Sequence, residues 1–248
     1  MKTIFLCEDT PEGIFTAVYD TWLVKGDFSL RVQKEHELEL FTEYKEVQTD
    51  QEKALKVARS VKQKLGQRVY GMVFAASLSY ELDKVDAIYN FLKLGFCKGA
   101  AVEEMHGMDE VCRIFELKRN VLNEAHYNKE FLRFQETKEN ILLARIHPKN
   151  QTLPLIAEHF CDRFPEENFV ILDATHAMAL FHEKSKEWYL SMLGKEALEQ
   201  IWTHRTDSNY EKLWKIFFNT ISIKERENYK CQRTHCALRY QGDMTEFE

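Results

Sequence analysis

The stretch SIKERENYKCQRTHCALRY, residues 222–240 and here called the basic segment, gathers side chains that could bind an anion or a metal ion. It holds five Lys or Arg residues against two acids, which gives a net charge of +3. Arg guanidinium groups match phosphate geometry, and aromatic rings between them can stack on bases. The pattern favours a nucleic-acid backbone as ligand, although a solvated tail that pairs with the chain's own acids would look the same. The proposed contacts are Lys224, Arg226, Asn228, Arg233 and Arg239.

The same segment raises the question of a metal site. Cys231, His235 and Cys236 could ligate zinc, but their C-x3-H-C spacing fits no common zinc motif, and a structural site needs four ligands. A Cys–His nucleophile from these residues would lack a third orienting group. The sequence also has no Walker loop, no G-x-G-x-x-G and no cysteine triad for an iron–sulfur cluster. No cofactor and no metal are therefore expected, with the Cys–His group left as an open alternative.

A second basic stretch, ARIHPKN, carries Arg145, His147 and Lys149 at every second position near the end of a predicted strand. Side chains alternate along a strand, so these three are expected on one face. The pattern is equally consistent with two interpretations: a solvent-exposed edge of a sheet, where Lys and Arg are common, and a surface that contacts phosphate.

Acid–base groups suggest an alternative class, an enzyme acting on a nucleobase or nucleotide. Asp173, His176 and His182 are expected to meet across a hairpin, where an Asp–His pair could orient a general base or form only a structural hydrogen bond. His159 falls on the apolar stripe of a predicted helix and is expected in the core. The candidate catalytic residues are Asp173, His182, His147 and His159, and the sequence does not decide whether the protein is an enzyme.

The amino-acid composition limits the class of protein to which these interpretations can apply. Of the 248 residues, 30% are charged and 44% are apolar, as in globular proteins. No apolar run approaches the roughly 20 residues that span a bilayer, and the apolar run at the N-terminus is too short for a signal peptide, so a cytoplasmic protein without membrane contact is expected. Its six cysteines form no CxxC pair and are expected to be reduced and mostly in the core.

Charge is unevenly distributed along the chain. Residues 1–50 hold five bases and eleven acids, which accounts for the whole net charge of −6. The other 198 residues balance, with 29 bases against 29 acids. The net charge argues against indiscriminate nucleic-acid binding, whereas the polarity of the chain allows a local basic surface.

The first half of the chain is predicted to be a strand–helix–strand region followed by helices. TIFLC predicts a buried strand, and a helix capped by Asp9 or Thr10 follows, with Pro11 in its first turn and Trp22 on its apolar stripe. Residues 28–47 predict two strands, and residues 50–135 predict helices. Breaks are expected in the middle of residues 110–134 and at Gly66, Gly71, Gly95 and Gly99.

The second half is predicted to hold a sheet and further helices. NILLARIHP predicts a strand, TLPLIAEHFCDRF a helix, and NFVILDAT, HAMALFHE and EWYLSML three successive strands, of which the first two or all three are antiparallel. The helix SNYEKLWKIFFNTIS should face inward with Tyr210, Leu213, Trp214 and Phe217. The fold class is therefore α+β, with an N-terminal α/β and helical region over 1–136 and an α+β domain with a mixed or antiparallel sheet over 137–248.

Several of these motifs, in this order, resemble one bacterial family. They include IFLCEDTPEGIFTAVYDTW, ELDKVDAIYNFLKLGF, LLARIHPKNQTLPLIAEHFCDRFPEENFVILD and YEKLWKIFFNTISIKERENYKCQRTHCALRY. The chain resembles over nearly its whole length the family labelled "probable DNA metabolism protein", whose C-terminal half is a domain of unknown function. That domain also occurs fused to uracil-DNA-glycosylase-like domains, and members are encoded beside a radical-SAM protein assigned to DNA modification or repair.

The resemblance implies an accessory protein of DNA repair or modification, with DNA and a radical-SAM protein as partners. Its motifs match at Arg163, Trp214, Arg226 and Asn228, and it carries no catalytic residues. The chain departs at His176, where members often have a basic residue, and at Glu227, where many have Arg. The expected backbone contacts are Arg145, Lys149, Arg163, Lys224, Arg226, Arg233 and Arg239.

A third alternative is an interaction scaffold that touches no nucleic acid. In it, the acidic N-terminal region, with Glu35, Glu37 and Glu39, would dock a basic partner.

Overall fold

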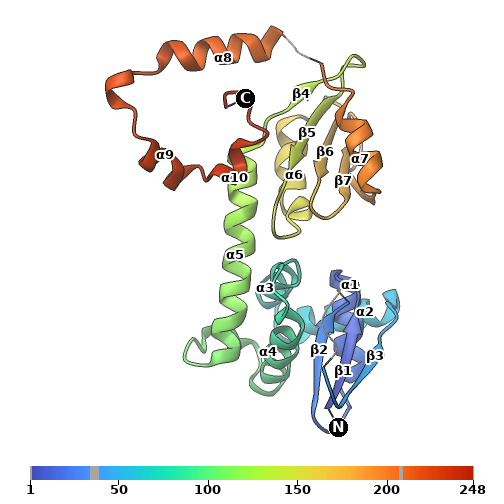
Figure 1. The fold of residues 1–248 in the computed structure, drawn as a ribbon. Coiled ribbons are helices and arrows are strands. Elements are labelled where there is room, and N and C mark those ends of the chain that lie inside the picture. Colours follow the sequence, from blue (N-terminus) through green and yellow to red (C-terminus); the bar gives the residue numbers. More distant parts are fainter. Residues whose placement is uncertain (1, 34–38, 207–208, 248) are drawn as a thin grey trace. The chain divides into compact units, whose positions relative to one another are not determined.

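The computed structural model describes residues 2–33, 39–206 and 209–247, and it leaves the side chains of 209–211 undescribed. Glu35, Glu37 and the side chain of Tyr210 therefore lie outside the described residues. The chain divides into two compact units, Met1–Leu122 and Asn123–Glu248. Figure 1 traces the chain through both units.

The first unit contains a three-stranded parallel sheet. Strand β1 (Lys2–Cys7) lies between β2 (Phe28–Val32) and β3 (Thr42–Glu46), so Ile4 pairs with both Ser29 and Tyr44. Helix α1 (Pro11–Thr21) connects β1 to β2, and Thr10 Oγ1 accepts a hydrogen bond from the Gly13 amide at 3.0 Å. The predicted first strand, the Thr10 cap and both strands within residues 28–47 are confirmed.

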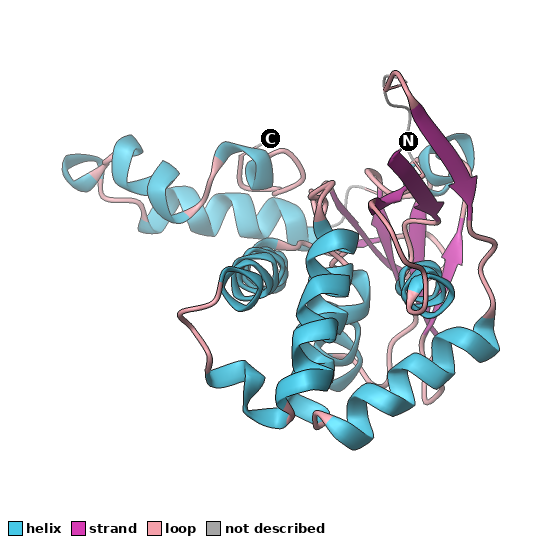
Figure 2. Ribbon diagram, turned by 90° about the horizontal axis from the view of Figure 1, so that it is seen from below, coloured by secondary structure: helices cyan, strands magenta, loops and turns pink. Residues whose placement is uncertain are grey.

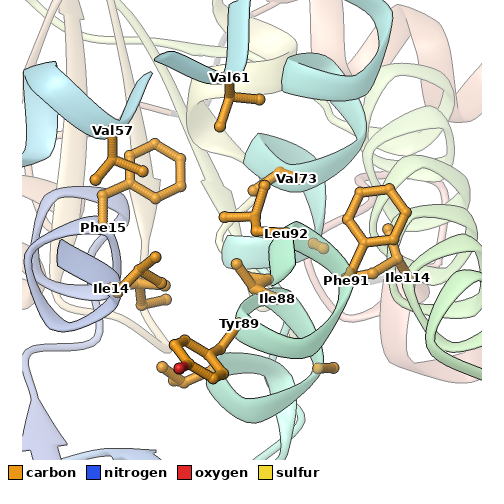
Figure 3. Packing of buried hydrophobic residues seen from close by; sticks show 14 of the residues in the cluster. Ile14, Phe15, Val57, Val61, Val73, Ile88, Tyr89, Phe91, Leu92 and Ile114 are labelled. Carbon is orange, nitrogen blue, oxygen red and sulfur yellow. The ribbon is translucent and has the colours of Figure 1, made fainter. Parts of the chain in front are cut away.

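Helices complete the first unit and hold its core. They are α2 (Gln51–Lys64), α3 (Gln67–Ser77), α4 (Lys84–Lys98), the 3₁₀ turn η1 (Ala100–Glu104) and α5 (Asp109–Phe131). Figure 3 shows Ile14 and Phe15 of α1 packed with Val57 and Val61 of α2 and with apolar residues of α3, α4 and α5. Apolar side chains at helical spacing make this core, as the sequence predicts.

Glycine has two different roles among these helices. Gly66 and Gly99 have φ angles of 100° and 77°, which other residues rarely adopt, and both lie at helix ends as predicted. Gly71 and Gly95 were predicted as breaks, but they lie inside α3 and α4. At Gly95 a Cβ would lie 2.9 Å from Leu65 Cδ1, so this glycine allows two segments to approach closely.

Helix α5 is one continuous helix, so the predicted break within residues 110–134 is wrong. Its 23 residues include no Gly and no Pro, and nothing in the sequence forces an interruption. The boundary between the two compact units falls within the residues of this helix, upstream of the division predicted between residues 136 and 137.

The second unit is built on a five-stranded mixed sheet. Its order is β4 (Gln135–Glu136), β5 (Leu142–Ile146), β6 (Phe169–Asp173), β7 (Met178–His182) and β8 (Tyr189–Met192). β5 and β6 are parallel, and the other pairs are antiparallel, so of the two predicted alternatives all three strands β6, β7 and β8 are antiparallel.

Helices cover both faces of this sheet. Helix α6 (Leu153–Arg163) connects β5 to β6 and buries Ile156 and Phe160 against Ile171, whereas α7 (Lys195–Trp202) packs on Leu172 from the other face. Figure 2 colours these strands magenta and the helices cyan. Neighbouring residues on β6 thus enter different cores because side chains alternate along a strand. The mixed α and β architecture confirms the predicted fold class.

The chain continues into four short C-terminal elements. They are α8 (Asn209–Ile221), η2 (Lys224–Arg226), α9 (Tyr229–His235) and α10 (Leu238–Gln241). Among the described residues, no helix has both the length and the apolar content to cross a bilayer. All six cysteines are free, but only Cys7 and Cys236 are buried, so the expectation that most lie in the core is wrong.

A buried ion pair lies at the carboxyl end of β1. Lys84, at the start of α4, is completely buried, and its Nζ donates to the carboxylate of Asp9 and to the carbonyl of Ser79. A buried charge is tolerated when it is paired and hydrogen-bonded, whereas removal of one partner leaves the other uncompensated. The pair therefore joins α4 to the β1–α1 connection.

The substitution Asp9→Asn should destabilise the first unit by about 3 kcal/mol, because the buried Lys84 ammonium would lose its ion pair with the Asp9 carboxylate. The double variant Asp9→Asn/Lys84→Met should recover part of this loss. Urea unfolding followed by circular dichroism measures both. The control is Asp20→Asn, which removes the partly exposed pair with Lys53 and should cost at most about 1 kcal/mol. Equal losses at the two sites would show that burial of Lys84 contributes nothing.

Candidate nucleic-acid interface

The two predicted basic stretches meet in the second unit at a small hollow. Arg145 and His147 at the end of β5 line it together with Arg239, Tyr240 and Asp243 from the C-terminal elements. The hollow measures only about 20 Å³, so it holds about one water molecule rather than a ligand. The side chains are close because they bind one another.

Asp243 is the centre of this contact. Its carboxylate accepts a hydrogen bond from Arg145 Nε at 2.8 Å, Arg145 Nη2 lies 2.7 Å from the same oxygen, and His147 Nε2 lies 3.1 Å from the other oxygen. Arg145 and His147 therefore share one face of β5, as predicted, and the guanidinium carbon of Arg145 also lies 4.4 Å from the centre of the Trp202 ring. Burial opposes ionisation of Asp243, but the hydrogen bonds from His147 and Arg145 outweigh it and lower the pKa of this carboxyl.

A second carboxylate, that of Glu124 in α5, forms hydrogen bonds and an ion pair with residues of the same region. It is buried and accepts hydrogen bonds from the amides of Lys149 and Asn150 and from the Asn150 side chain. Arg239 reaches it with a 3.2 Å ion pair. Tyr240 packs on Tyr127 and Phe131 at 5.6 Å between ring centres, and burial raises its pKa to about 12.

The C-terminal residues are held by a third pair of the same kind. Arg133 donates to Glu246 at 2.7 Å. Burial opposes ionisation of Glu246, yet the Arg133 hydrogen bond lowers its pKa overall. Arg145 and Arg239, both predicted phosphate contacts, are thus engaged by the chain's own carboxylates.

Four basic side chains of the basic segment have a different environment. Lys224, Arg226, Lys230 and Arg233 are exposed, and none forms an ion pair within residues 2–33, 39–206 and 212–247. Asn228 accepts a hydrogen bond from the Cys231 amide at 3.0 Å and so caps α9. This cap fixes the turn between η2 and α9, and the four charges lie on both sides of it.

Helix α8 precedes these charges and differs from the prediction. Leu213 and Phe217, expected to face inward, are 60% and 52% exposed, and Trp214 is 40% exposed. Phe218, by contrast, packs edge-on against Phe247 at 5.9 Å. The amphipathic pattern thus identified the helix correctly, but most of its apolar face lies open to solvent.

The remaining predicted contacts lie elsewhere in the second unit. Arg163 is exposed at the end of α6, where its guanidinium carbon lies 5.6 Å from the centre of the Phe164 ring. Lys149 is exposed after β5, and its amide bonds to Glu124.

The acid–base candidates do not form one group. Asp173 bonds to His176 Nδ1 at 2.7 Å, as the hairpin predicts. His182, expected beside them, instead pairs with Phe169 at the opposite end of β6, where Nδ1 contacts the Glu167 carbonyl. His159 is exposed on α6, so its prediction as a core residue is wrong. The hairpin has five paired positions, and its length separates Asp173 from His182.

The possible metal ligands Cys231 and Cys236 differ in their exposure to solvent. Cys231 is exposed on α9, whereas Cys236 is buried with its sulfur 3.8 Å from that of Met244. In the part of the chain that the structure describes, no three His, Cys, Asp or Glu residues are arranged to hold a metal ion.

Sequence reasoning missed the three acids that organise this region, Glu124, Asp243 and Glu246. For Glu124 a signal existed, because it falls at an apolar position of α5 between the buried Val121 and Ala125. For Asp243 none existed, since its partner Arg145 lies 98 residues away.

Asp243→Asn should lower the free energy of unfolding of the second unit by about 2 kcal/mol at pH 7. Because the folded-state pKa of Asp243 is depressed, its contribution is present above the unfolded-state value of about 3.9 and is lost as the pH falls through the folded-state pKa. The difference between the two proteins should therefore shrink below pH 4 in urea titrations. Asp162→Asn, at an exposed position of α6, is the control and should change stability by less than about 0.5 kcal/mol. A loss that stays constant with pH would assign Asp243 a packing role only.

Comparison with known proteins places these features in a family. A search of curated proteins and a search of solved structures each gave no match. The family model described as "Domain of unknown function (DUF4130)" matches residues 83–246, from the start of α4 to the end of the C-terminal elements. The match covers more than half of the chain and includes the whole sheet of the second unit, the basic segment and the acids that hold it. The chain belongs to the DUF4130 family.

Proposed function

We propose that this protein is an accessory factor of DNA repair or modification that binds nucleic-acid backbone through the basic segment. One observation carries the proposal. Lys224, Arg226, Lys230 and Arg233 lie exposed within ten residues and form no ion pair in the described part of the chain. Exposed, uncompensated Lys and Arg side chains are what neutralise phosphates and release counterions on binding.

The surroundings of these charges support the same ligand. Tyr229 lies between them and is 64% exposed, so its ring is accessible to a base. Trp214 exposes part of its ring on the helix before. Arg145 is paired with Asp243, and Arg239 is paired with Glu124. In this proposal the two arginines position the basic segment, and they contribute less to phosphate binding than the four unpaired side chains.

Catalysis is not part of the proposal. Asp173 and His182 lie at opposite ends of the β6–β7 pairing, His147 contacts Asp243, and His159 is exposed on α6. General acid–base catalysis requires groups that converge on one reacting atom.

The proposal predicts salt-dependent binding that depends on four side chains. Replacement of Lys224, Arg226, Lys230 and Arg233 by Gln should remove about four phosphate contacts. With a log–log salt slope of about −0.9 per contact on duplex DNA, the slope should weaken by about 3.6. Fluorescence polarisation with labelled single-stranded and duplex DNA from 50 to 200 mM salt measures this change.

The control removes four positive charges elsewhere in the same unit, with Lys138, Lys184, Lys186 and Lys195, all exposed, replaced by Gln. This variant should keep the slope nearly unchanged. Binding weakened equally by both variants would indicate only a net-charge effect, and no binding of the unmodified protein at 50 mM salt would overturn the proposal.

A second candidate function, an interaction scaffold, rests on the exposed face of α8. Leu213, Ile216, Phe217 and Ile221 are each more than half exposed, and such a face is typical of a helix that docks on another protein. The partner implied by the family resemblance is a radical-SAM protein. The acidic residue Glu39, named for this alternative, instead pairs with Arg31 at 2.6 Å within its own unit.

For this candidate, Leu213→Asp and Phe217→Asp should abolish binding of a purified radical-SAM protein of the kind that the family resemblance implies, since a charge in an apolar interface is costly. Isothermal titration calorimetry measures the affinity. Leu55→Asp, at an exposed apolar position of α2, serves as control and should bind normally. Unchanged binding by the α8 variants would exclude α8 as the docking surface.

A further inference from the structure

A cavity of about 470 Å³ opens between α1 and α2 of the first unit. Pockets for small molecules measure roughly 300–1,000 Å³ and combine apolar walls with a few polar groups. No predicted contact of the basic segment takes part in this cavity, because every lining residue comes from residues 18–96.

The walls are apolar and aromatic. Val18 and Val57 are buried and form the inner side, and the rings of Tyr19, Trp22 and Phe96 surround them. Trp22 and Phe96 meet edge to face, with 5.3 Å between ring centres, and Trp22 remains 37% exposed. Such walls suit a flat ring system, which can pack on aromatic side chains at little conformational cost.

The polar groups of the cavity come from one line of helix α2. Lys56, Ser60 and Lys64 follow one another at a spacing of four residues and so share a face of the helix. Lys56 Nζ lies 5.9 Å from the centre of the Tyr19 ring, and Lys64 Nζ lies 5.7 Å from the centre of the Phe96 ring. Both ammonium groups therefore border the aromatic wall.

Among the described residues no carboxylate lines the cavity, so the charged side chains at its wall are those of Lys56 and Lys64. Asp20, the acid next in sequence to the lining residue Tyr19, is engaged by Lys53 at 2.7 Å. Lys56 and Lys64 form no ion pair within the residues whose side chains are described, 2–33, 39–206 and 212–247. A neutral ligand would reduce the hydration of both ammonium groups without supplying a counter-charge, whereas an anion supplies it.

We propose that this cavity binds a planar aromatic anion. The ring of the ligand packs on Trp22 and Phe96, and its phosphate or carboxylate group accepts hydrogen bonds from Lys56, Lys64 and the Ser60 hydroxyl. A nucleoside monophosphate and an aromatic carboxylate share this chemistry. The site is separate from the basic segment, so either proposal can fail without the other.

The test compares each anion with a neutral relative by isothermal titration calorimetry. AMP is compared with adenosine, and 2-naphthoate with 2-naphthamide. At least one anion should bind about tenfold more tightly than its neutral relative, as expected for two charge-assisted contacts near a surface. Preference for AMP alone identifies a nucleotide as the ligand, and preference for naphthoate alone identifies a carboxylate.

Variants assign the binding to this cavity. The double substitution Lys56→Gln/Lys64→Gln should abolish the preference for the anion, and Ser60→Trp should abolish binding of both members of a pair by filling the space. Lys62→Gln is the matched control, because Lys62 lies on the same helix with its Nζ 4.1 Å from the centre of the Tyr70 ring and does not line the cavity. This control should bind like the unmodified chain.

A further control separates the two anion sites. AMP binding should persist in the variant that has Gln at Lys224, Arg226, Lys230 and Arg233. The proposal is overturned if none of the four ligands binds at millimolar concentration, if anions and neutral relatives bind equally, or if Lys62→Gln matches the double variant. Should Ser60→Trp prove unfolded by circular dichroism, the exposed Lys56 and Lys64 positions decide the question alone.

Discussion

The carboxylate of Asp243 fixes where the basic segment stands on the second unit. It accepts hydrogen bonds from Arg145 and His147 at the end of β5, and this contact joins the C-terminal elements to the five-stranded sheet. Glu124 and Arg239 make a second attachment, and Arg133 and Glu246 make a third. Each is partly buried, so each partner depends on the other for compensation.

These attachments divide the basic residues into two groups with different physical roles. Arg145 and Arg239 use their charge inside the unit, where a phosphate would have to displace a carboxylate that is already bound. Lys224, Arg226, Lys230 and Arg233 keep theirs at the surface. A chain with net charge −6 can thus present local positive charge. Residues 51–248 are neutral in sum, and because some of their acids form the attachments described above, other basic side chains remain without an ion pair in the described part of the chain.

The first unit also contains both paired and unpaired lysine side chains. Lys84 is buried against Asp9 and supports the fold, whereas Lys56 and Lys64 border an aromatic cavity without a carboxylate. Burial distinguishes the two cases. A buried ammonium group requires a partner from the chain itself, whereas an exposed one is solvated by water and remains available to a ligand. The two proposed anion sites therefore differ in form: one is an exposed segment, and the other is a cavity that opens to solvent.

Local signals in the sequence determined most of the secondary structure. Thr10 and Pro11 start α1, Pro148 follows β5, and the alternating strands after residue 168 form the antiparallel run, because caps, prolines and short periodicities act over a few residues. Tertiary structure alone decided which charges pair. Arg145 and Asp243 lie 98 residues apart, Glu124 meets Arg239 across a similar separation, and α8 exposes an apolar face that its periodicity marks for burial. Periodicity reports that a face is apolar, but the packing of the whole chain determines whether anything covers it and which of several acids reaches a given base.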